Sequence, residues 1–281
     1  MLHKYIWHND RIVPVEKARF SPGQAGLLNG WGLFTTMRIY DGRPFAFDRH
    51  WKRLATDAGR IKLPLEYEAE ATREHLARLI ETNQVKQGCA RIYFIYNQAG
   101  YWASDEPMPN VDLLICTANL PERKGPARLT VMEHGRHAQS PLAGLKVTSW
   151  LGNVWSLDQT SRRGFDEVIL LNERGEVAEC TAANIFSVSG KEVRTPPLSS
   201  GCLPGVTRDV LLEIAGAQGM SISETPINLQ DLFTADEVFV TSTTREVQPV
   251  SQIDARQIPQ VRGLVTSQLA EAFSQYVAQS L

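Results

Sequence analysis

Alternation of apolar and polar residues with a period of two predicts that the chain begins with strands. The stretches 5–7 and 12–15 flank the turn residues 8–10, which predicts a short opening hairpin. The stretches 34–40 and 44–47 flank Asp41-Gly42, the strongest short hairpin signal in the sequence. Strands are further expected at 90–96, 111–117, 128–132, 167–171, 176–180, 183–188, 193–196 and 237–241.

Helical spacing replaces this alternation in five segments. From Asp48 on, apolar residues such as Leu54 and Ala58 recur on one face, and Asp48 has the side chain of an N-cap. The helix expected at 151–163 has a stop signal, because two arginines would lie in its last turn with Gly164 just beyond. The other helices are expected at 68–84, 209–218 and 260–279.

Two loops and one connector divide these elements. The segment 21–32 is rich in glycine, which predicts a loop that brings backbone close to another part of the chain, and a second loop is expected at 97–109. The polar stretch 120–127 contains proline and glycine and lies between two long patterned halves. It predicts an N-terminal domain at 1–119, a linker at 120–127 and a C-terminal domain at 128–281. No internal repeat is found, and the mixed order of elements indicates an α/β (α+β) fold.

Composition excludes several classes of protein. The chain has 281 residues, 43% of them apolar, so it can bury a large core, and its formal charge of −2 offers no basic field for nucleic acid or an acidic membrane. The N-terminus is too polar for a signal peptide and no apolar run could cross a bilayer, so a cytoplasmic protein is expected. The four cysteines have no paired spacing, and His134 and His137 have no third ligand nearby, so no metal site is predicted.

Two common catalytic motifs are absent from the sequence. No serine lies in a Gly-x-Ser-x-Gly elbow, which argues against a hydrolase of that type. Gly30-Trp-Gly32 lacks both the further glycine and the strand-to-helix context of a dinucleotide fingerprint, so nicotinamide binding is not supported.

Lys146 ends an apolar run, Pro-Leu-Ala-Gly-Leu, whose residues are expected to face a core. A lysine in a protein interior is costly unless its charge is paired or neutralised. One explanation is a Schiff base, since a lysine in a dry pocket can condense with a carbonyl, as in the anchoring of pyridoxal phosphate. The other is a lysine that ends a strand and extends its amine to water, which this stretch taken alone favours.

Three places offer groups that a phosphate would need. Thr207 lies at an expected helix N-terminus, where backbone N–H groups and the helix dipole favour an anion. The run 241–244, Thr-Ser-Thr-Thr, supplies hydroxyls at a strand end, and Arg53 on a helix face could supply a bidentate charge. Each also has a simpler explanation: an N-cap, a polar loop and a solvated charge, respectively.

Glu179 is a candidate for a buried carboxylate. Period-two counting puts its side chain on the face of Val177, opposite Glu176 and Ala178. A buried carboxylate must be paired, and a protonated ring nitrogen would serve. The alternative is an edge strand on which both glutamates are solvated.

Taken together, these stretches resemble the class IV aminotransferases, the fold-type IV pyridoxal phosphate enzymes. This group includes branched-chain and D-amino acid aminotransferases, R-selective amine transaminases and aminodeoxychorismate lyase. The motifs that carry the resemblance occur in the family's order and are GWGLFTTMR at 30–38, RHWKRL at 49–54, LAGLK at 142–146, GEVAECTAANIF at 175–186, LPGVTR at 203–208 and ADEVFVTST at 235–243.

The resemblance implies a role for each matched residue. Lys146 would be the Schiff-base lysine and proton-transfer base, and Glu179 would keep the pyridine nitrogen of pyridoxal 5'-phosphate protonated. It also implies a small N-terminal α/β domain, a larger C-terminal domain with a barrel-like sheet, and a homodimer whose partner completes each substrate pocket. The other cofactor-binding residues that it implies are Arg53, Val206, Thr207 and Thr243 at the phosphate, Leu203 on the ring face, and Asn184.

The departures from the family pattern concern the substrate. Branched-chain enzymes usually carry glutamate after the residue that matches Phe34, whereas Thr35 here is more similar to the lyase. Trp150 stands where those enzymes place a tyrosine near the cofactor's phenolic oxygen. Arg38 and Arg91 are candidates for binding a substrate carboxylate, although Arg91 in mid-strand could equally face solvent. The full set of candidate substrate residues is Thr36, Arg38, Arg91, Trp150 and Thr244.

We therefore predict an aminotransferase that moves an amino group from a branched-chain-like or other small amino donor to a 2-oxo acid. The alternative on the same scaffold is aminodeoxychorismate lyase, which releases pyruvate and 4-aminobenzoate. A third possibility, from a different class, is a cofactor-binding or interaction protein without catalysis, which the retained lysine, glutamate and phosphate residues disfavour.

Overall fold

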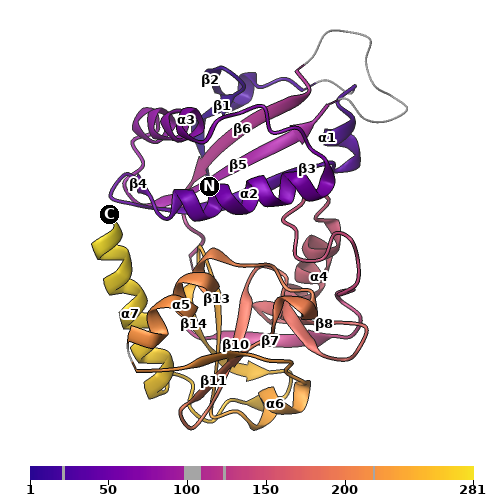
Figure 1. Cartoon of the computed structure of the whole chain (residues 1–281), viewed down its shortest axis with the longest axis vertical. Coiled ribbons are helices and arrows are strands. Elements are labelled where there is room, and N and C mark those ends of the chain that lie inside the picture. Colours follow the sequence, from indigo (N-terminus) through magenta and orange to yellow (C-terminus); the bar gives the residue numbers. More distant parts are fainter. Residues whose placement is uncertain (21–22, 98–108, 123–124, 218) are drawn as a thin grey trace. The chain divides into compact units, whose positions relative to one another are not determined.

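The chain forms two compact units, which are connected at several points along the sequence (Figure 1). The first comprises Met1–Glu122, Leu145–Trp150 and Leu281, and the second comprises Arg123–Gly144 and Leu151–Ser280. The structure is a computed structural model that describes residues 1–20, 23–97, 109–122, 125–217 and 219–281. Most of the loop expected at 97–109, the start of the loop at 21–32, two linker residues and residue 218 lie outside the described residues.

This grouping differs from the predicted division in one short segment. The sequence assigns Leu145–Trp150 to the C-terminal domain, whereas the structure groups it with the first unit. The reason is backbone pairing: the N–H of Phe34 donates to the carbonyl of Lys146 at 2.9 Å, and the N–H of Thr148 donates to the carbonyl of Gly32 at 2.9 Å.

An antiparallel six-stranded sheet forms the first unit, with the strand order β2-β1-β6-β5-β3-β4. The predicted turn at Asp41-Gly42 is confirmed, since both residues have positive φ (46° and 80°) and Tyr40 pairs with Arg43. The strands are β1 (Leu2–His8), β2 (Arg11–Pro14), β3 (Gly32–Tyr40), β4 (Arg43–Pro44), β5 (Gly88–Tyr96) and β6 (Val111–Ala118).

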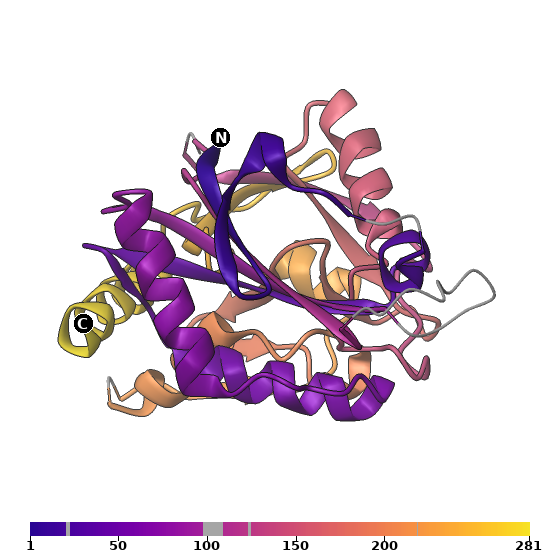
Figure 2. The ribbon, with the colours of Figure 1, turned by 90° about the horizontal axis from the view of Figure 1, so that it is seen from above.

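Helices α2 (Phe47–Ile61) and α3 (Ala69–Thr82) lie on one side of this sheet, as Figure 2 shows. Leu54 and Leu76 are fully buried against sheet residues such as Phe94, so one apolar core joins both helices to the strands. The expected N-cap at Asp48 is wrong. The cap is Ala46 in the left-handed conformation, and Asp48 lies in the first turn, where a negative charge still favours the helix dipole.

The glycine-rich segment brings backbone close to other backbone, as predicted. A Cβ on Gly26 would lie 2.0 Å from the carbonyl oxygen of Tyr96, and one on Gly30 would lie 2.8 Å from Cα of Ser149. Only glycine permits such approaches. The segment also contains the short helix α1 (Ala25–Asn29), which the sequence pattern did not predict, and η1 (Val15–Lys17) precedes it.

The second unit is built on a mixed sheet of nine strands in the order β12-β11-β10-β13-β14-β7-β8-β9, with β15 paired to β14. Strand β7 runs parallel to both β14 and β8, and the other pairs are antiparallel except β11 with β12. The strands are β7 (Ala127–Met132), β8 (Glu167–Leu171), β9 (Val177–Cys180), β10 (Asn184–Ser189), β11 (Glu192–Thr195), β12 (Ile222–Glu224), β13 (Glu237–Ser242), β14 (Glu246–Ile253) and β15 (Arg256–Gln257).

The helices of the second unit are α4 (Leu151–Arg162), α5 (Val206–Ala217), α6 (Leu229–Thr234) and α7 (Leu264–Ser280), with the short η2 (Leu198–Ser200) before α5. The stop signal of α4 is confirmed, since Gly164 has a φ of +80°. Helix α5 begins three residues earlier than predicted, which moves Val206 and Thr207 into its first turn. Helix α7 begins four residues later than predicted.

No helix within the described residues of either unit combines the length and the apolar character needed to span a bilayer.

Candidate active site

Lys146 lies in an extended segment whose backbone is fixed on both sides. Its carbonyl accepts from the N–H of Phe34, and its own N–H donates to Oδ2 of Asp57 at 3.3 Å. Val147 forms an isolated bridge with Leu33. Burial raises the pKa of Asp57, although the bond from Lys146 and the charge of Arg53 act in the opposite direction. The segment therefore holds the lysine at a defined place beside β3 and α2.

The premise that the residues before Lys146 face a core is wrong. Pro141 and Leu142 are exposed, and Ala143 and Gly144 are half-buried in a turn. The apolar letters of this stretch reflect a turn followed by an extended strand-like segment, so hydrophobicity alone gave the wrong reason for attending to Lys146.

Aromatic rings surround the amine of Lys146. Its Nζ lies 4.5 Å from the ring centre of Phe34 and 5.7 Å from that of Trp150. Phe34 in turn stacks on Tyr93 at 5.6 Å and meets Trp150 edge to face at 5.8 Å. Ring faces attract a cation, so the rings of Phe34 and Trp150 help to hold this amine in place.

Arg91 belongs to the same aromatic cluster. Its guanidinium carbon lies 5.4 Å from the ring centre of Phe34, and it donates to Thr36 Oγ1 at 3.1 Å and to the hydroxyl of Tyr93 at 3.3 Å. Arg91 is exposed, as expected for a side chain that faces solvent, but its guanidinium is also fixed by the hydrogen bonds to Thr36 and Tyr93. Arg38 instead donates to the carbonyl of Gly88 at 3.0 Å and lies over Tyr40.

Arg53 lies on α2 and donates from Nη2 to Thr35 Oγ1 at 2.9 Å. Thr35 also forms a 2.8 Å hydrogen bond with His50 Nδ1. Burial, together with the positive charges of Arg53 and Lys146, holds the pKa of His50 well below its usual range. The first unit thus brings Lys146, Trp150, Arg91 and Thr36 to one cluster and Arg53 to the helix beside it.

Glu179 in the second unit is buried, with 6% of its surface exposed. Its Oε1 accepts from Arg136 Nε at 3.0 Å, and its Oε2 accepts from the backbone N–H of Leu203 at 3.0 Å. The alternative of two solvated glutamates is therefore wrong for Glu179, although β9 is the last strand in its sheet. A charge-assisted bond to each oxygen offsets the cost of burying the carboxylate.

Strict alternation does not describe the strand of Glu179. The pairing of β9 with β8 shifts between Leu170 and Leu171, opposite Glu179 and Val177. In addition, all four residues of β9 are buried, so neither face of the strand is solvated. The sequence identified the buried glutamate, but its two-face argument depended on a regular strand that is not present.

Arg136 is a site residue that sequence reasoning missed. Besides Glu179 it contacts Asn153, donating from Nη1 to Oδ1 at 2.9 Å, and Asn153 donates to the carbonyl of Thr181 at 2.8 Å. The only sequence signal was indirect: a buried carboxylate requires a partner, and Arg136 lies between the two histidines considered as metal ligands.

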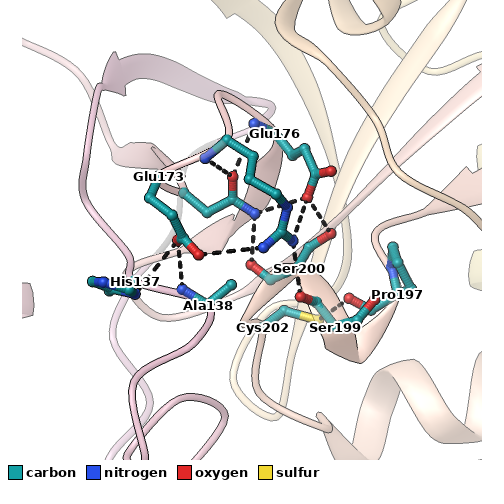
Figure 3. A network of polar contacts seen from close by, with 10 residues as sticks. His137, Ala138, Glu173, Glu176, Pro197, Ser199, Ser200 and Cys202 are labelled. Atoms are coloured by element: carbon teal, nitrogen blue, oxygen red, sulfur yellow. Dashed lines mark hydrogen bonds and ion pairs between the residues drawn. The ribbon is translucent and has the colours of Figure 1, made fainter.

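Glu176 belongs to a different network, which Figure 3 shows. Its Oε2 accepts from Arg174 Nη2 at 2.7 Å, from Asn172 Nδ2 at 2.9 Å and from the hydroxyl of Ser200 at 3.2 Å. These bonds, that of Arg174 first, lower the pKa of Glu176. This cluster ties the hairpin turn before β9 to the loop that leads to Leu203, so Glu176 has a structural role.

His137 lies at the edge of the same network (Figure 3). Its Nδ1 is 3.7 Å from Oε2 of Glu173, which also accepts from the N–H of Ala138 at 2.7 Å. Among the described residues no group of three or more histidine, cysteine or acidic side chains is arranged to hold a metal ion.

The start of α5 contains two of the residues for which the sequence predicts a role in binding a phosphate. Val206 and Thr207 are its first two residues and are 6% and 4% exposed. The first N–H groups of a helix have no partner within the helix. Asn184 on β10 holds the preceding loop by donating to the carbonyl of Leu203 at 2.9 Å, and a Cβ on Gly205 would lie 2.0 Å from Asn184 Oδ1.

Thr243 and Thr244 lie in the turn between β13 and β14, which the N–H of Arg245 closes on the carbonyl of Ser242 at 3.1 Å. Arg245 anchors this turn in the interior. Its Nη2 forms an ion pair with Oε2 of Glu167 at 2.9 Å, and the two side chains are 3% and 0% exposed. Glu167 also accepts from Thr181, two residues beyond Glu179. The second unit therefore joins the Thr243 turn and the Glu179 strand through one buried ion pair.

Comparison with known sequences decides the family. Residues 32–253 match the sequence model of the family described as Amino-transferase class IV. The chain belongs to the class IV aminotransferases. A Methanocaldococcus jannaschii protein provisionally named a branched-chain-amino-acid aminotransferase is 30% identical over 273 residues, covering 95% of this chain and 94% of that protein. A D-alanine aminotransferase of Listeria monocytogenes is 29% identical over 283 residues, covering 97% and 96%.

Solved structures of class IV aminotransferases share the fold. A branched-chain aminotransferase from Thermoproteus uzoniensis with norvaline superposes with a TM-score of 0.90 at 27% identity, covering 99% of this chain and 96% of that one. A Legionella pneumophila protein provisionally named a 4-amino-4-deoxychorismate lyase gives 0.86 at 26% identity, covering 93% and 96%. The predicted fold class is confirmed: this class IV aminotransferase has the two-sheet architecture of the fold-type IV enzymes and is an enzyme.

Proposed function

We propose that this enzyme uses pyridoxal 5'-phosphate to move an amino group from an amino acid to a 2-oxo acid, with Lys146 as its reactive residue. The observation that carries the proposal is the setting of Lys146: a backbone fixed by Phe34 and Asp57, and an amine held over the rings of Phe34 and Trp150. A structure of a related branched-chain aminotransferase contains pyridoxamine 5'-phosphate and gives a TM-score of 0.89 at 26% identity, covering 99% of this chain and 95% of that one.

The donor set of the chain fits such a cofactor. In the second unit the N-terminal turn of α5 offers N–H groups and the Thr207 hydroxyl, and the turn of Thr243 offers another hydroxyl. In the first unit Arg53 offers a guanidinium, and each of these groups is of a kind that binds a phosphate dianion. Leu203 offers an apolar side chain for one face of a ring. When bound, the cofactor supplies an electron sink that stabilises the carbanion formed at the substrate carbon.

Glu179 would accept a hydrogen bond from a protonated ring nitrogen. Each carboxylate oxygen can accept two hydrogen bonds. Oε1 of Glu179 accepts one from Arg136 and Oε2 accepts one from Leu203, so each oxygen can accept a further donor. Arg136 would fix the orientation of this carboxylate. Asn184 would act indirectly: its hydrogen bond to the carbonyl of Leu203 would hold the loop that contains Leu203 and Gly205 in place.

Lys146 would carry out the proton transfers. Its Nζ would take the proton from the α-carbon of the amino donor and return it at the neighbouring carbon of the cofactor.

Arg91 supports an amino acid as the donor, as opposed to a simple amine. Its guanidinium lies in the cluster of Phe34 and is oriented by Thr36 and Tyr93, which is an arrangement suited to a carboxylate. The relatives named for branched-chain amino acids and D-alanine agree with a small donor. Thr244, in the turn beside Thr243, is a second candidate for contact with the substrate.

The test is the visible spectrum of the purified enzyme loaded with pyridoxal phosphate. We expect a yellow band that is lost on adding one amino donor and returns with a 2-oxo acid, and parallel titrations with L- and D-amino acids and a pair of chiral amines give the preferred donor. A chain that shows no band after loading, or whose band responds to no amino donor, would contradict the proposal.

Aminodeoxychorismate lyase activity is the second candidate, favoured by Thr35 and Thr36 after Phe34 and by the Legionella pneumophila structure. The same spectrum separates the two. Release of pyruvate from aminodeoxychorismate, by an enzyme whose band no amino acid removes, would establish the lyase.

The homodimer implied by the family is also proposed, with helix α4 as part of its interface. Leu151, Val154 and Trp155 recur at helical spacing and are 78%, 52% and 57% exposed, and a second copy would cover this apolar stripe. We expect Trp155→Glu to shift the enzyme toward monomers in light scattering after size exclusion. Lys191→Glu, on the exposed turn after β10, should leave the dimer intact, and an unchanged dimer with Trp155→Glu would exclude α4 from the interface.

A further inference from the structure

Arg53, Thr35 and His50 form a short hydrogen-bonded chain in the first unit. Arg53 Nη2 lies 2.9 Å from Thr35 Oγ1, which lies 2.8 Å from His50 Nδ1. Thr35 is 0% exposed and His50 2% exposed, so water does not compete for these bonds. His50 and Arg53 are one turn apart on α2, and Thr35 lies on β3, which packs against that helix.

The direction of these hydrogen bonds follows from the chemistry of the three groups. A guanidinium only donates, so Thr35 Oγ1 accepts from Arg53. Within the described residues the two partners of Thr35 Oγ1 are Arg53 and His50, so its hydroxyl proton is satisfied only if it is donated to His50 Nδ1. His50 then carries its proton on Nε2 and is neutral. The burial of the ring, followed by the positive charges of Arg53 and Lys146, favours that neutral form by holding the pKa of His50 low.

We propose that Thr35 and His50 are positioning residues that orient the Arg53 guanidinium toward the phosphate group of the cofactor. The proposal rests on the proposed function, in which Arg53 binds that phosphate. A long arginine side chain loses rotamer freedom when it binds an anion, and a partner that fixes one nitrogen beforehand removes part of this cost. His50 keeps the Thr35 hydroxyl proton directed away from Arg53, so the oxygen presents its lone pair to the guanidinium. Because Thr35 and neutral His50 carry no charge, they fix Arg53 without cancelling its attraction for a phosphate dianion.

The experiment compares two ligands that differ only in the phosphate. Dissociation constants of pyridoxal phosphate and of pyridoxal are measured on the apoenzyme by fluorescence quenching. We expect Thr35→Val to raise the dissociation constant of pyridoxal phosphate about tenfold and to change that of pyridoxal by no more than about twofold. Thr35→Ser keeps the hydroxyl and should retain the original affinity. His50→Leu should give a similar loss, and the double variant Thr35→Val/His50→Leu should lose no more than either single variant.

The matched control is Thr72→Val on α3. Thr72 is also 0% exposed, but its hydroxyl bonds to the carbonyl of Glu68 at 2.9 Å. This variant should leave both dissociation constants unchanged. If Thr35→Val weakens both ligands equally, its role is only structural and the proposal is overturned.

Arg53→Leu separates this proposal from the proposed function. If Arg53→Leu discriminates between the two ligands and Thr35→Val does not, only the positioning proposal is overturned. If Arg53→Leu does not discriminate between them, the phosphate role of Arg53 is wrong and both fall. A measurement without cofactor tests the geometry itself: in the long-range ¹H–¹⁵N spectrum of ¹⁵N-histidine-labelled enzyme, His50 should carry its proton on Nε2 at pH 7. A proton on Nδ1 would contradict the proposed direction of the hydrogen bond from Thr35 to His50 and would overturn the positioning proposal.

Discussion

Replacing Lys146 with alanine is expected to lower kcat for amino transfer by about 10³-fold or more, because in the proposed function both the attachment of the cofactor and the proton transfer depend on this one amine. The fold should remain, since the backbone of Lys146 makes the bonds to Phe34 and Asp57. The measurement is the steady-state rate with the best donor, together with peptide mapping after borohydride reduction. In the parent enzyme the pyridoxyl group should be found on the peptide that contains Lys146.

Lys191→Ala is the matched control for this variant. Lys191 is an exposed lysine in the second unit, so its removal changes the lysine count without touching the site. It should leave the rate and the labelled peptide unchanged. A Lys146→Ala enzyme that retained its rate, or a pyridoxyl group found on another lysine of the parent, would refute the role of Lys146.

Arg245→Leu is expected to produce the largest loss of stability. It would leave the carboxylate of Glu167, which is 0% exposed, without its cation, and breaking a buried ion pair in this way costs about 3–5 kcal/mol. Unfolding in urea followed by circular dichroism should show the lowered free energy of unfolding. Arg194→Leu, which removes a surface pair with Glu192 at 2.7 Å, should change the unfolding midpoint little.

A double variant separates loss of the pair from loss of packing. Glu167→Gln/Arg245→Leu removes both charges and should recover most of the stability lost in Arg245→Leu, because no isolated charge then remains in the interior. Equal destabilisation of the single and double variants would mean that the arginine acts through packing and not through its charge. Because Arg245 anchors the turn of Thr243, the single variant should also bind pyridoxal phosphate more weakly.

Local patterns identified most elements where one face of a strand or helix is regular. The hairpin at Asp41-Gly42 and the end of α4 at Gly164 were predictable because each depends on a few neighbouring residues. Strand β14 was not predicted, since Pro249 and the polar residues around it are typical of an edge or a loop. It nonetheless lies between β13 and β7, with an irregularity between Val250 and Gln252 in its pairing to β7.

The residues of the candidate site also fall into those that local sequence predicts and those that depend on distant contacts. Lys146, Glu179 and Thr207 could be named from motifs, because each motif is short and continuous. Arg136 could not, since its contact with Glu179 joins residues 43 positions apart and depends on how β9 and the loop before Lys146 pack. Hydrophobic patterning also misjudged the run before Lys146, because a turn and a buried strand can have the same apolar letters.

The membership of Leu145–Trp150 in the first unit has a consequence for synthesis on the ribosome. The chain completes Met1–Glu122 and then makes residues 123–144 of the second unit before the segment of Lys146 appears. At about 5–20 residues per second this delay is roughly one to four seconds. During that time Gly32 and Phe34 lack the backbone partners that Thr148 and Lys146 provide, which leaves a short open edge on the nascent sheet. The segment that closes this edge is thus the one that contains Lys146, so a nascent chain halted before it would expose unpaired backbone groups of β3 and would also lack the proposed reactive lysine.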